Sequence, residues 1–330
     1  MNFAIYGCGN IAKVHAEAVM SIEDARLVGC FDMYVPSRAA FSEKYGIKAY
    51  SSARELIDDP EIDVISVCTP NGTHADIAIQ LLLANKNVVI EKPMATTVRD
   101  CDRIIEAEKN SKGRVLVISQ FRTSSDVDKA KKIIEGGEIG RVVLCDLYMK
   151  YHRSEAYYEG TWKGTRALDG GGALMNQGVH GIDLLQYVAG PVKNVKSIVR
   201  TLVHDIEVED AAVAAVEFES GAIGVIEATT AITPGFDREM KIYGSRGCVH
   251  LTENKITRYI KDGIEMSTED FVSRNDSNDP TLVTKEEHAK QISEFLRVIR
   301  GENLSYVNSS EGRKAVALIE KIYENGEDKK

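Results

Sequence analysis

Short apolar runs alternate with amphipathic stretches over the first 120 residues of the chain. The apolar runs are rich in valine and isoleucine and have the length of buried strands; they occupy residues 3–7, 26–32, 63–69, 87–91 and 114–119. Between them, apolar residues recur at intervals of three and four, which predicts helices over 10–20, 37–45, 73–84 and 97–110. This alternation is typical of a parallel sheet covered on both faces. We therefore predict a doubly wound α/β domain over residues 1–120.

The pattern changes after residue 120. Helices are predicted over 124–136 and, after a run of glycines, over 171–188, with a strand at 141–150. Alternating strands then follow from 192 to about 260, and a Ser-Gly turn within 211–229 predicts a hairpin. A polar loop over 265–284 precedes helices at 285–300 and 309–325. Residues 121–330 are thus predicted to form a second α/β domain with an open, mostly antiparallel sheet.

Composition narrows the class of protein. The chain has 330 residues, 43% of them hydrophobic, and a formal net charge of -9, which argues against a nucleic-acid partner. Six cysteines lie far apart and seven histidines are scattered, so we expect neither disulfides nor a metal site. The chain enters a strand pattern at Asn2 and contains no apolar run of roughly 20 residues. We therefore expect a cytoplasmic protein without membrane contact.

The first strand-to-helix turn carries the sequence YGCGNIA, residues 6–12. Bare backbone N–H groups at Gly7, Cys8, Gly9, Asn10 and Ile11, together with the positive end of the following helix, can hold a pyrophosphate. Ala12 takes the place of the third glycine and still permits close helix packing. The turn alone is also compatible with a purely structural role, because tight turns use glycine without any ligand.

Asp32 ends the second strand, where a carboxylate can bond both ribose hydroxyls of NAD and repel the 2′-phosphate of NADP. The structural alternative is a loop or helix-capping carboxylate. Arg38 can lie on the adenine or contact a phosphate. NAD is therefore the expected cofactor, and NADP is disfavoured without being excluded.

Two further strand ends point to the same edge of the predicted sheet. In CTPNGTH, residues 68–74, we expect Thr69, Asn71 and His74 to line the nicotinamide side, and Thr73 to cap the next helix. In EKP, residues 91–93, Glu91 and Lys92 are assigned to the cofactor site, and Pro93 restrains Lys92 and is expected to follow a cis bond. Gln120 follows the last strand of the series and is assigned to the cofactor site as well.

A second chemical segment is DGGGALMNQGVHGIDLL, residues 169–185. The glycines predict flexible entry to a helix on which Asn176, His180 and Asp183 share one face. With an ordinary pKa of about 6.5, His180 is suited to proton transfer near neutral pH, with Lys92 standing opposite. A histidine with a purely structural role is the alternative.

Aromatic and basic residues mix in YHRSEAYYEGTWKGTRALDGG, residues 151–171. Tyr157, Tyr158 and Trp162 can stack on a sugar ring, whereas Lys163 and Arg166 can pair with a carboxylate or phosphate. A loop that packs through its aromatics and solvates its charges is an equal alternative. Arg122, shortly after Gln120, is assigned to the substrate side.

Taken together, YGCGNIAKVHAEAV, CTPNGTHADIAIQLL, VVIEKPMATT, GEIGRV and LDGGGALMNQGVHGIDLLQYVAGPV resemble the Gfo/Idh/MocA family of nicotinamide oxidoreductases over nearly the whole chain. The resemblance implies a Rossmann domain, a C-terminal sheet that binds substrate and forms dimer or tetramer contacts, and catalysis by Lys92 and His180. One position departs from inositol-dehydrogenase-like members, which commonly carry aspartate where this chain has Asn176. An amide cannot relay a proton, so Asn176 is expected to bind a substrate hydroxyl.

The sequence thus predicts hydride transfer between NAD and a secondary alcohol of a sugar-like molecule: a sugar, sugar acid, sugar nucleotide, sialic-acid derivative or inositol. In the oxidative direction, Lys92 or His180 takes the hydroxyl proton. A cycle that reduces and reoxidises NAD within one round remains open. The alternatives are dihydrodiol dehydrogenase or another carbonyl reductase and, in another class, a dinucleotide-dependent sensor without catalysis.

Overall fold

The computed structural model describes residues 1–267 and 285–326. Contacts divide these residues into two compact units. Unit 1 contains residues 1–120 and 285–314, and unit 2 contains residues 121–267 and 315–326. Helix α10 (Ser309–Gly326) is divided between the units at Lys314.

Unit 1 is built on a six-stranded parallel sheet. Its strands are β1 (Asn2–Tyr6), β2 (Arg26–Phe31), β3 (Lys48–Ala49), β4 (Val64–Val67), β5 (Asn87–Ile90) and β6 (Val115–Val117). In the strand order β3-β2-β1-β4-β5-β6, the chain builds outward from β1 to one edge and then from β4 to the other, as in the doubly wound dinucleotide-binding fold. The predicted fold class of the first domain is therefore confirmed.

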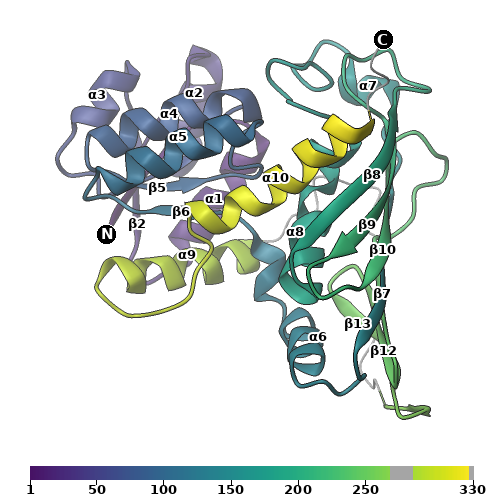
Figure 1. Cartoon of the computed structure of the whole chain (residues 1–330). Coiled ribbons are helices and arrows are strands. Elements are labelled where there is room, and N and C mark those ends of the chain that lie inside the picture. Colours follow the sequence, from purple (N-terminus) through teal and green to yellow (C-terminus); the bar gives the residue numbers. More distant parts are fainter. Residues whose placement is uncertain (268–284, 327–330) are drawn as a thin grey trace. The chain divides into compact units, whose positions relative to one another are not determined.

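Helices cover both faces of this sheet; Figure 1 shows α4 and α5 on one side and α1 and α9 on the other. They are α1 (Asn10–Met20), α2 (Val35–Tyr45), α3 (Ala53–Asp58), α4 (His74–Leu83), α5 (Val98–Lys109) and α9 (Lys285–Ile299), with a short 3-10 turn η1 (Asn71–Thr73). The Thr97 hydroxyl caps α5 by accepting the backbone N–H of Asp100. The two short elements β3 and α3 were not predicted, because both are brief and only weakly apolar.

Helix α9 joins unit 1, although the sequence analysis placed all residues from 121 to 330 in one domain. Its apolar stripe of Ile292, Phe295 and Leu296 is fully buried in one core with Ala12 and Val19 of α1. A helix with one apolar stripe joins the surface that covers it, whatever its position along the chain. The division of the fold is therefore discontinuous in sequence.

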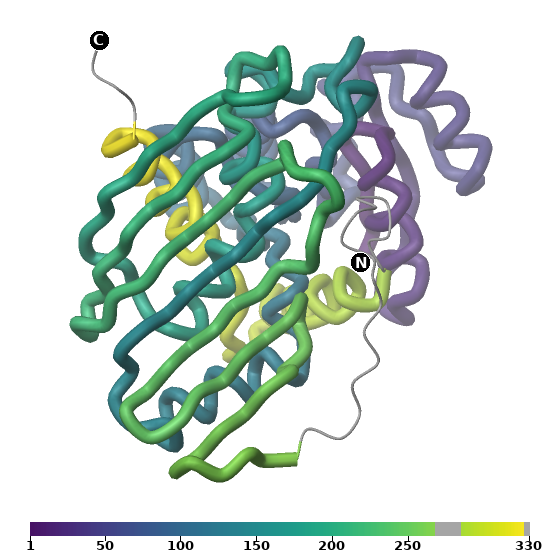
Figure 2. Tube along the Cα trace, turned by 90° about the vertical axis from the view of Figure 1, so that its right-hand side faces the viewer, coloured from purple at the N-terminus to yellow at the C-terminus, as the bar shows by residue number. Residues whose placement is uncertain are grey.

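Unit 2 is built on an eight-stranded, mostly antiparallel sheet, which confirms the predicted class of the second domain. Its strands are β7 (Val142–Lys150), β8 (Val192–Arg200), β9 (Ala211–Phe218), β10 (Ile223–Thr229), β11 (Glu239–Gly244), β12 (Gly247–Thr252), β13 (Lys255–Lys261) and β14 (Ile264–Glu265). The order is β14-β13-β12-β11-β7-β10-β9-β8, with β7 and β10 parallel. The broad sheet faces the viewer in Figure 2, and the described helices of the unit lie behind it.

The helices of unit 2 include one irregular segment. After the 3-10 turn η2 (Gln120–Thr123), the unit has α6 (Ser125–Glu135), α7 (Glu155–Tyr158), α8 (Val179–Ala189) and the second part of α10. The helix predicted over 171–188 begins instead as a π-helix, η3 (Ala173–Gly178), and continues as α8. Among the described helices, none is long and apolar enough to cross a membrane. Most of the polar loop predicted over 265–284 lies outside the described residues.

Candidate active site

The glycine turn between β1 and α1 has the geometry of a phosphate cradle. Gly7 has a φ of +95°, and a Cβ there would lie 2.8 Å from the backbone of Cys68, so only glycine fits. A Cβ added at Gly9 would meet no atom within 4 Å, so this position faces open space. Gly9 is also the N-cap of α1 and provides no capping side chain. The N–H groups at Asn10 and Ile11 thus stand at a helix N-terminus with room in front of it.

Asp32 and Arg38 lie beside this turn. One carboxylate oxygen of Asp32 accepts the backbone N–H of Cys8 at 2.7 Å, and the other accepts that of Tyr34 at 2.7 Å. The Arg38 guanidinium donates to the carbonyl oxygens of Asp32 and Ser51 at 3.4 and 3.1 Å. The structure therefore places the residues assigned to the adenosine side next to the glycine turn.

The turn after β4 is tied to the segment after β5 by His74. This histidine is fully buried, and its ring nitrogens lie 2.8 Å from the carbonyl oxygen of Pro93 and 2.9 Å from that of Thr69. Burial lowers the pKa of His74, whereas the two carbonyl oxygens act in the opposite direction because they favour a proton on each ring nitrogen. His74, assigned from sequence to the nicotinamide side, thus holds two loops together, and cofactor binding by it stays a prediction.

Thr73 does not cap α4 through its side chain, contrary to the sequence analysis. Its hydroxyl lies 2.7 Å from both the carbonyl oxygen of Pro70 and the hydroxyl oxygen of Thr69, inside the preceding turn. Local hydrogen bonding therefore competes successfully with the helix cap. Asn71 and Gln120, both assigned to the cofactor site, are buried.

Lys92 follows β5 at the carboxyl edge of the unit 1 sheet. The Lys92-Pro93 bond is cis, which confirms the prediction made for it. Lys92 is partly buried, whereas Glu91 is buried with its carboxylate directed into the protein, where it contacts His15, His288 and the backbone N–H of Lys92. Sequence reasoning grouped Glu91 with cofactor ligands and assigned no role to the two histidines.

In unit 2, Asn176 and His180 stand on either side of the junction between η3 and α8. The His180 ring lies 4.7 Å from that of Phe121 between ring centres, and Asn176 is buried. Because Asn176 belongs to a π-helical turn, the α-helical spacing used in the sequence analysis does not by itself place it below His180. Such π turns occur frequently at functional sites.

Arg122 has a partner within unit 2. Its guanidinium donates to both carboxylate oxygens of Asp183 at 2.8 and 2.5 Å and lies 4.7 Å from the ring centre of Tyr187. Asp183, expected to share a polar face with Asn176 and His180, is buried and is the counter-ion of Arg122. The pair gives Arg122 a structural role, so substrate binding by Arg122 stays a prediction.

The aromatic segment after β7 packs largely on itself. Tyr158 is buried and meets the ring of Tyr157 edge-on, and the Lys163 ammonium lies 3.6 Å from the centre of the Tyr157 ring. This favours the structural alternative for the two tyrosines. Trp162 is only partly buried. Arg166 lines a depression of about 530 Å³ in unit 2, together with other charged and polar side chains: Arg200, Glu207 and Tyr323.

Sequence reasoning missed Glu209, a buried carboxylate that holds the start of the glycine-led helix. It accepts the backbone N–H groups of Gly172 and Leu174 at 2.9 and 2.8 Å and the hydroxyl of Tyr323 at 2.9 Å. Cβ atoms at Gly171 and Gly172 would lie 2.2 Å from the Tyr323 hydroxyl and 2.0 Å from the Glu209 carbonyl oxygen. These glycines permit close packing, where the sequence analysis expected flexible entry. Burial raises the pKa of Glu209.

Comparisons with known proteins identify the family of the chain. The profile described as "Oxidoreductase family, NAD-binding Rossmann fold" matches residues 1–119, and the "GFO/IDH/MocA C-terminal domain" matches residues 127–250. Myo-inositol 2-dehydrogenase of Thermotoga maritima is 31% identical over 260 residues, covering 75% of this chain and 74% of the relative. The chain belongs to the Gfo/Idh/MocA family.

Other Gfo/Idh/MocA members match over almost their full length. Inositol 2-dehydrogenase of Rhizobium meliloti is 25% identical over 332 residues, covering 97% of this chain and 95% of the relative. The crystal structure of the WlbA dehydrogenase from Bordetella pertussis in complex with NADH and UDP-GlcNAcA has a TM-score of 0.88 and 30% identity. That match covers 99% of this chain and 96% of the WlbA chain. This Gfo/Idh/MocA protein is accordingly an NAD-dependent oxidoreductase.

Proposed function

We propose that the protein transfers a hydride between NAD and a secondary alcohol on a sugar-like ring, with Lys92 and His180 handling the proton. The observation that carries the proposal is the placement of Lys92 at the carboxyl edge of a dinucleotide-binding sheet, in a family whose members include inositol 2-dehydrogenases. Ligands of open α/β sheets bind at this edge.

The residues of unit 1 fit the dinucleotide. Gly7 and Gly9 leave the start of α1 accessible to a pyrophosphate, and the Asp32 carboxylate beside them suits the two ribose hydroxyls of NAD. When bound, NAD supplies the hydride acceptor. Thr69, Asn71, His74 and Gln120 are proposed to shape the nicotinamide side.

In the oxidative direction, the ring carbon gives up its hydrogen as hydride, and the hydroxyl proton passes to Lys92 or His180. Lys92 belongs to unit 1 and His180 to unit 2, and we propose that both act on the reacting carbon when substrate is bound. Holding the reactants in contact removes the entropic cost of an encounter, which is a large part of such catalysis.

For the substrate, we propose a polyhydroxylated ring with or without an anionic group. Asn176 can donate to and accept from a ring hydroxyl, and Trp162 can cover an apolar ring face. Lys163 and Arg166 are proposed to meet a carboxylate or phosphate. The WlbA structure, which contains a sugar nucleotide beside NADH, makes sugar nucleotides and sugar acids the first compounds to test.

The test is a screen of NAD reduction against sugars, inositols, sugar acids and sugar nucleotides. With the best substrate, Lys92→Ala should lower kcat by about 10² to 10⁴, with NAD affinity and thermal unfolding close to wild type. Lys109→Ala, at a lysine exposed by 67%, is the matched control and should be silent. Binding of NAD without turnover of any compound would favour a sensor and refute the proposal.

We also propose that the protein forms a homodimer or homotetramer through the unit 2 sheet. Cross-strand neighbours point to the same side of a sheet, and one row across β8, β9, β10 and β7 contains Ile198, Val213, Glu227 and Tyr148. Ile198 and Val213 are exposed by 62% and 49%, which favours burial against a second copy.

Light scattering coupled to gel filtration tests this assembly. Val213→Lys should yield monomers, whereas Leu83→Lys, at an apolar and more exposed position of α4, should leave the assembly intact. A wild-type monomer at micromolar concentration would refute the proposal.

A cytoplasmic location is proposed as well. Cys8, Cys30, Cys68, Cys145 and Cys248 are buried thiols, as expected in a reducing compartment. Fractionation of the source cells tests it, and recovery outside the cytoplasm would refute it.

A further inference from the structure

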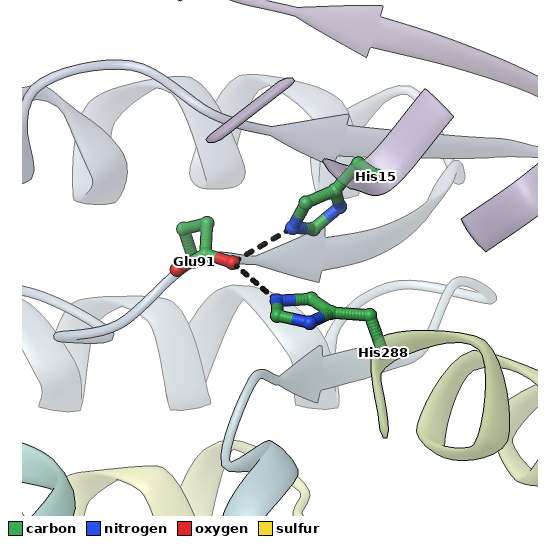
Figure 3. Close-up of side chains that lie close together, drawn as sticks. All are labelled: His15, Glu91 and His288. Atoms are coloured by element: carbon green, nitrogen blue, oxygen red, sulfur yellow. Dashed lines mark hydrogen bonds and ion pairs between the residues drawn. The ribbon is translucent and has the colours of Figure 1, made fainter. Parts of the chain in front are cut away.

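Two buried histidines and one buried carboxylate form a closed cluster next to the backbone of Lys92. His15 comes from α1, Glu91 directly follows β5, and His288 comes from α9 (Figure 3). The exposed fractions of the three residues are 0%, 4% and 0%. One carboxylate oxygen, Oε1 of Glu91, lies 2.7 Å from Nε2 of His15 and 3.2 Å from Nε2 of His288. All three residues belong to unit 1.

The hydrogen bonds fix the protonation of the cluster. Each Nε2 must carry a proton to donate to Glu91, whereas the Nδ1 atoms of His15 and His288 are buried with no hydrogen-bond partner among the described residues. Burying a bare lone pair costs less than burying an unbonded N–H of a cation. Both rings are therefore neutral, and the cluster carries one negative charge on Glu91.

The pKa directions agree with this protonation. Burial lowers the pKa of His15. Burial alone would raise the pKa of Glu91, but the two N–H donors outweigh it and hold that pKa well below its usual range.

The three ligand-type atoms lie within 4.8 Å of one another, so a metal ion has to be considered. Two features argue against it. The 2.7 Å contact between His15 and Glu91 is the length of a charge-assisted hydrogen bond, shorter than the roughly 3.3 Å between two ligands of a tetrahedral zinc ion. Metal-bound histidines also donate their second N–H to an acceptor, and neither Nδ1 has one among the described residues.

The cluster is connected directly to Lys92. The second carboxylate oxygen of Glu91 accepts the backbone N–H of Lys92 at 3.0 Å, and the backbone N–H of Glu91 donates to the carbonyl oxygen of Val67 at 3.1 Å. On the other side, His74 contacts the carbonyl oxygen of Pro93 at 2.8 Å. Buried side chains thus hold the backbone both before and after Lys92.

We propose that His15, Glu91 and His288 position Lys92 and place one buried negative charge at its backbone N–H, within one side-chain length of the amine, so that the amine keeps its proton to higher pH. The catalytic consequence rests on the proposed function of Lys92, but the effect on the amine does not. Among the described residues of unit 1, Cys68 and His74 also interact with this region; burial raises the pKa of the first and lowers that of the second.

The charge is tested with Glu91→Gln, which removes it and keeps the side-chain length. Trace acetylation of the intact protein over a pH series, read by mass spectrometry of the Lys92 peptide, gives the titration midpoint of the amine without any need for activity. We expect this midpoint to fall by about one to two pH units, the effect of a nearby unit charge at an effective dielectric constant of about 20.

Glu108→Gln is the matched control. Glu108 also accepts a backbone N–H, from Val115 at 2.8 Å, but Val115 pairs with Val88, at the start of β5 instead of its end. The control should leave the Lys92 midpoint unchanged. A folded Glu91→Gln protein with a wild-type midpoint would overturn the proposal.

Glu91→Asp distinguishes the effect of the charge from the effect of the position of the carboxylate. It also provides a test of the proposal if Glu91→Gln does not fold. Aspartate keeps the charge, so the Lys92 midpoint should stay within about 0.5 pH unit of wild type, but its shorter side chain cannot reach both histidines and the Lys92 backbone. We expect kcat to fall at least about tenfold, with the KM for NAD changed less than about threefold. A midpoint as low as expected for the glutamine variant, or a wild-type kcat, would overturn the proposal.

These outcomes distinguish failure of the proposed function from failure of the proposed role of the His15–Glu91–His288 cluster. If wild-type protein turns over no alcohol, the proposed function fails, and the acetylation curves still decide whether Glu91 acts on the Lys92 amine. If wild-type protein is active and both Glu91 variants behave like it, only the positioning cluster fails.

Discussion

The buried pair of Arg122 and Asp183 provides a quantitative test of the fold of unit 2. Two hydrogen bonds of 2.8 and 2.5 Å join the groups, and their side chains are exposed by only 10% and 8%. Asp183→Asn keeps the shape and removes the negative charge opposite the guanidinium. Breaking a buried pair from one side costs about 3–5 kcal/mol. For a domain of this size, the melting temperature should fall by about 6–20 °C.

The chain offers a specific probe for this measurement. Trp162 is its single tryptophan and lies in unit 2, so tryptophan fluorescence during urea or thermal unfolding reports on that unit. Asp128→Asn is the control, because the Asp128–Lys132 pair on α6 is exposed by 49% and 72% and should contribute only about 0.3–0.5 kcal/mol.

The result also distinguishes two roles for Arg122. If Arg122 mainly binds substrate, Asp183→Asn should raise KM while the free energy of unfolding stays within about 1 kcal/mol of wild type. That outcome would refute our reasoning. A loss of several kcal/mol in the variant, with little change in the Asp128→Asn control, would support the structural role.

Three further predictions concern other parts of the molecule. Phe295→Ala should destabilise unit 1 by about 3–5 kcal/mol, because Phe295 is fully buried in the core that α9 shares with α1. Circular dichroism should then show an early unfolding transition of unit 1, while the transition seen by Trp162 fluorescence stays where it is in wild type. A single unchanged transition would contradict this prediction. Asp32→Ser should weaken NAD binding about 10- to 100-fold in calorimetric titrations and weaken NADP less, and an equal loss for both would argue against ribose recognition. Asp210 accepts three backbone N–H groups, which outweigh its burial and hold its pKa below the usual value. The ionised carboxylate therefore stabilises the folded state above pH about 4, and this stabilisation is lost as pH falls through the folded-state pKa. In Asp210→Asn, the urea concentration at the midpoint of unfolding, read from Trp162 fluorescence, should therefore fall less on acidification than in wild type. An equal fall in both proteins would contradict this prediction.

The alternation of strands and helices, the glycine turn and the cis bond at Pro93 could be predicted because each depends on short-range chemistry. Apolar periodicity reports local structure directly. The φ of +95° at Gly7 requires glycine wherever it occurs. A parallel sheet then brings Thr69 and Lys92 to one edge, so the candidate residues follow from topology.

The interactions that sequence reasoning missed are those between distant segments. Nothing local in the sequence indicates that His15 and His288 meet at Glu91, or that Asp183 pairs with Arg122. Membership of α9 in unit 1 was missed for the same reason, since its apolar stripe could pack against an apolar surface of either unit. One signal was available: His15 lies three residues after Ala12 and four before Val19, which places it on the buried side of α1, where a polar residue needs a partner.

The discontinuous first unit has a consequence for synthesis of the chain. Ala12, Val19 and the rest of the apolar side of α1 emerge from the ribosome long before Phe295 and Leu296, which cover them. At about 5–20 residues per second, translation from Gln120 to Lys285 takes roughly 10–30 s. During that interval the nascent first unit exposes an apolar surface that a chaperone can bind. For the same reason, a chimera that exchanges the nucleotide-binding part between relatives has to carry the late helix with it.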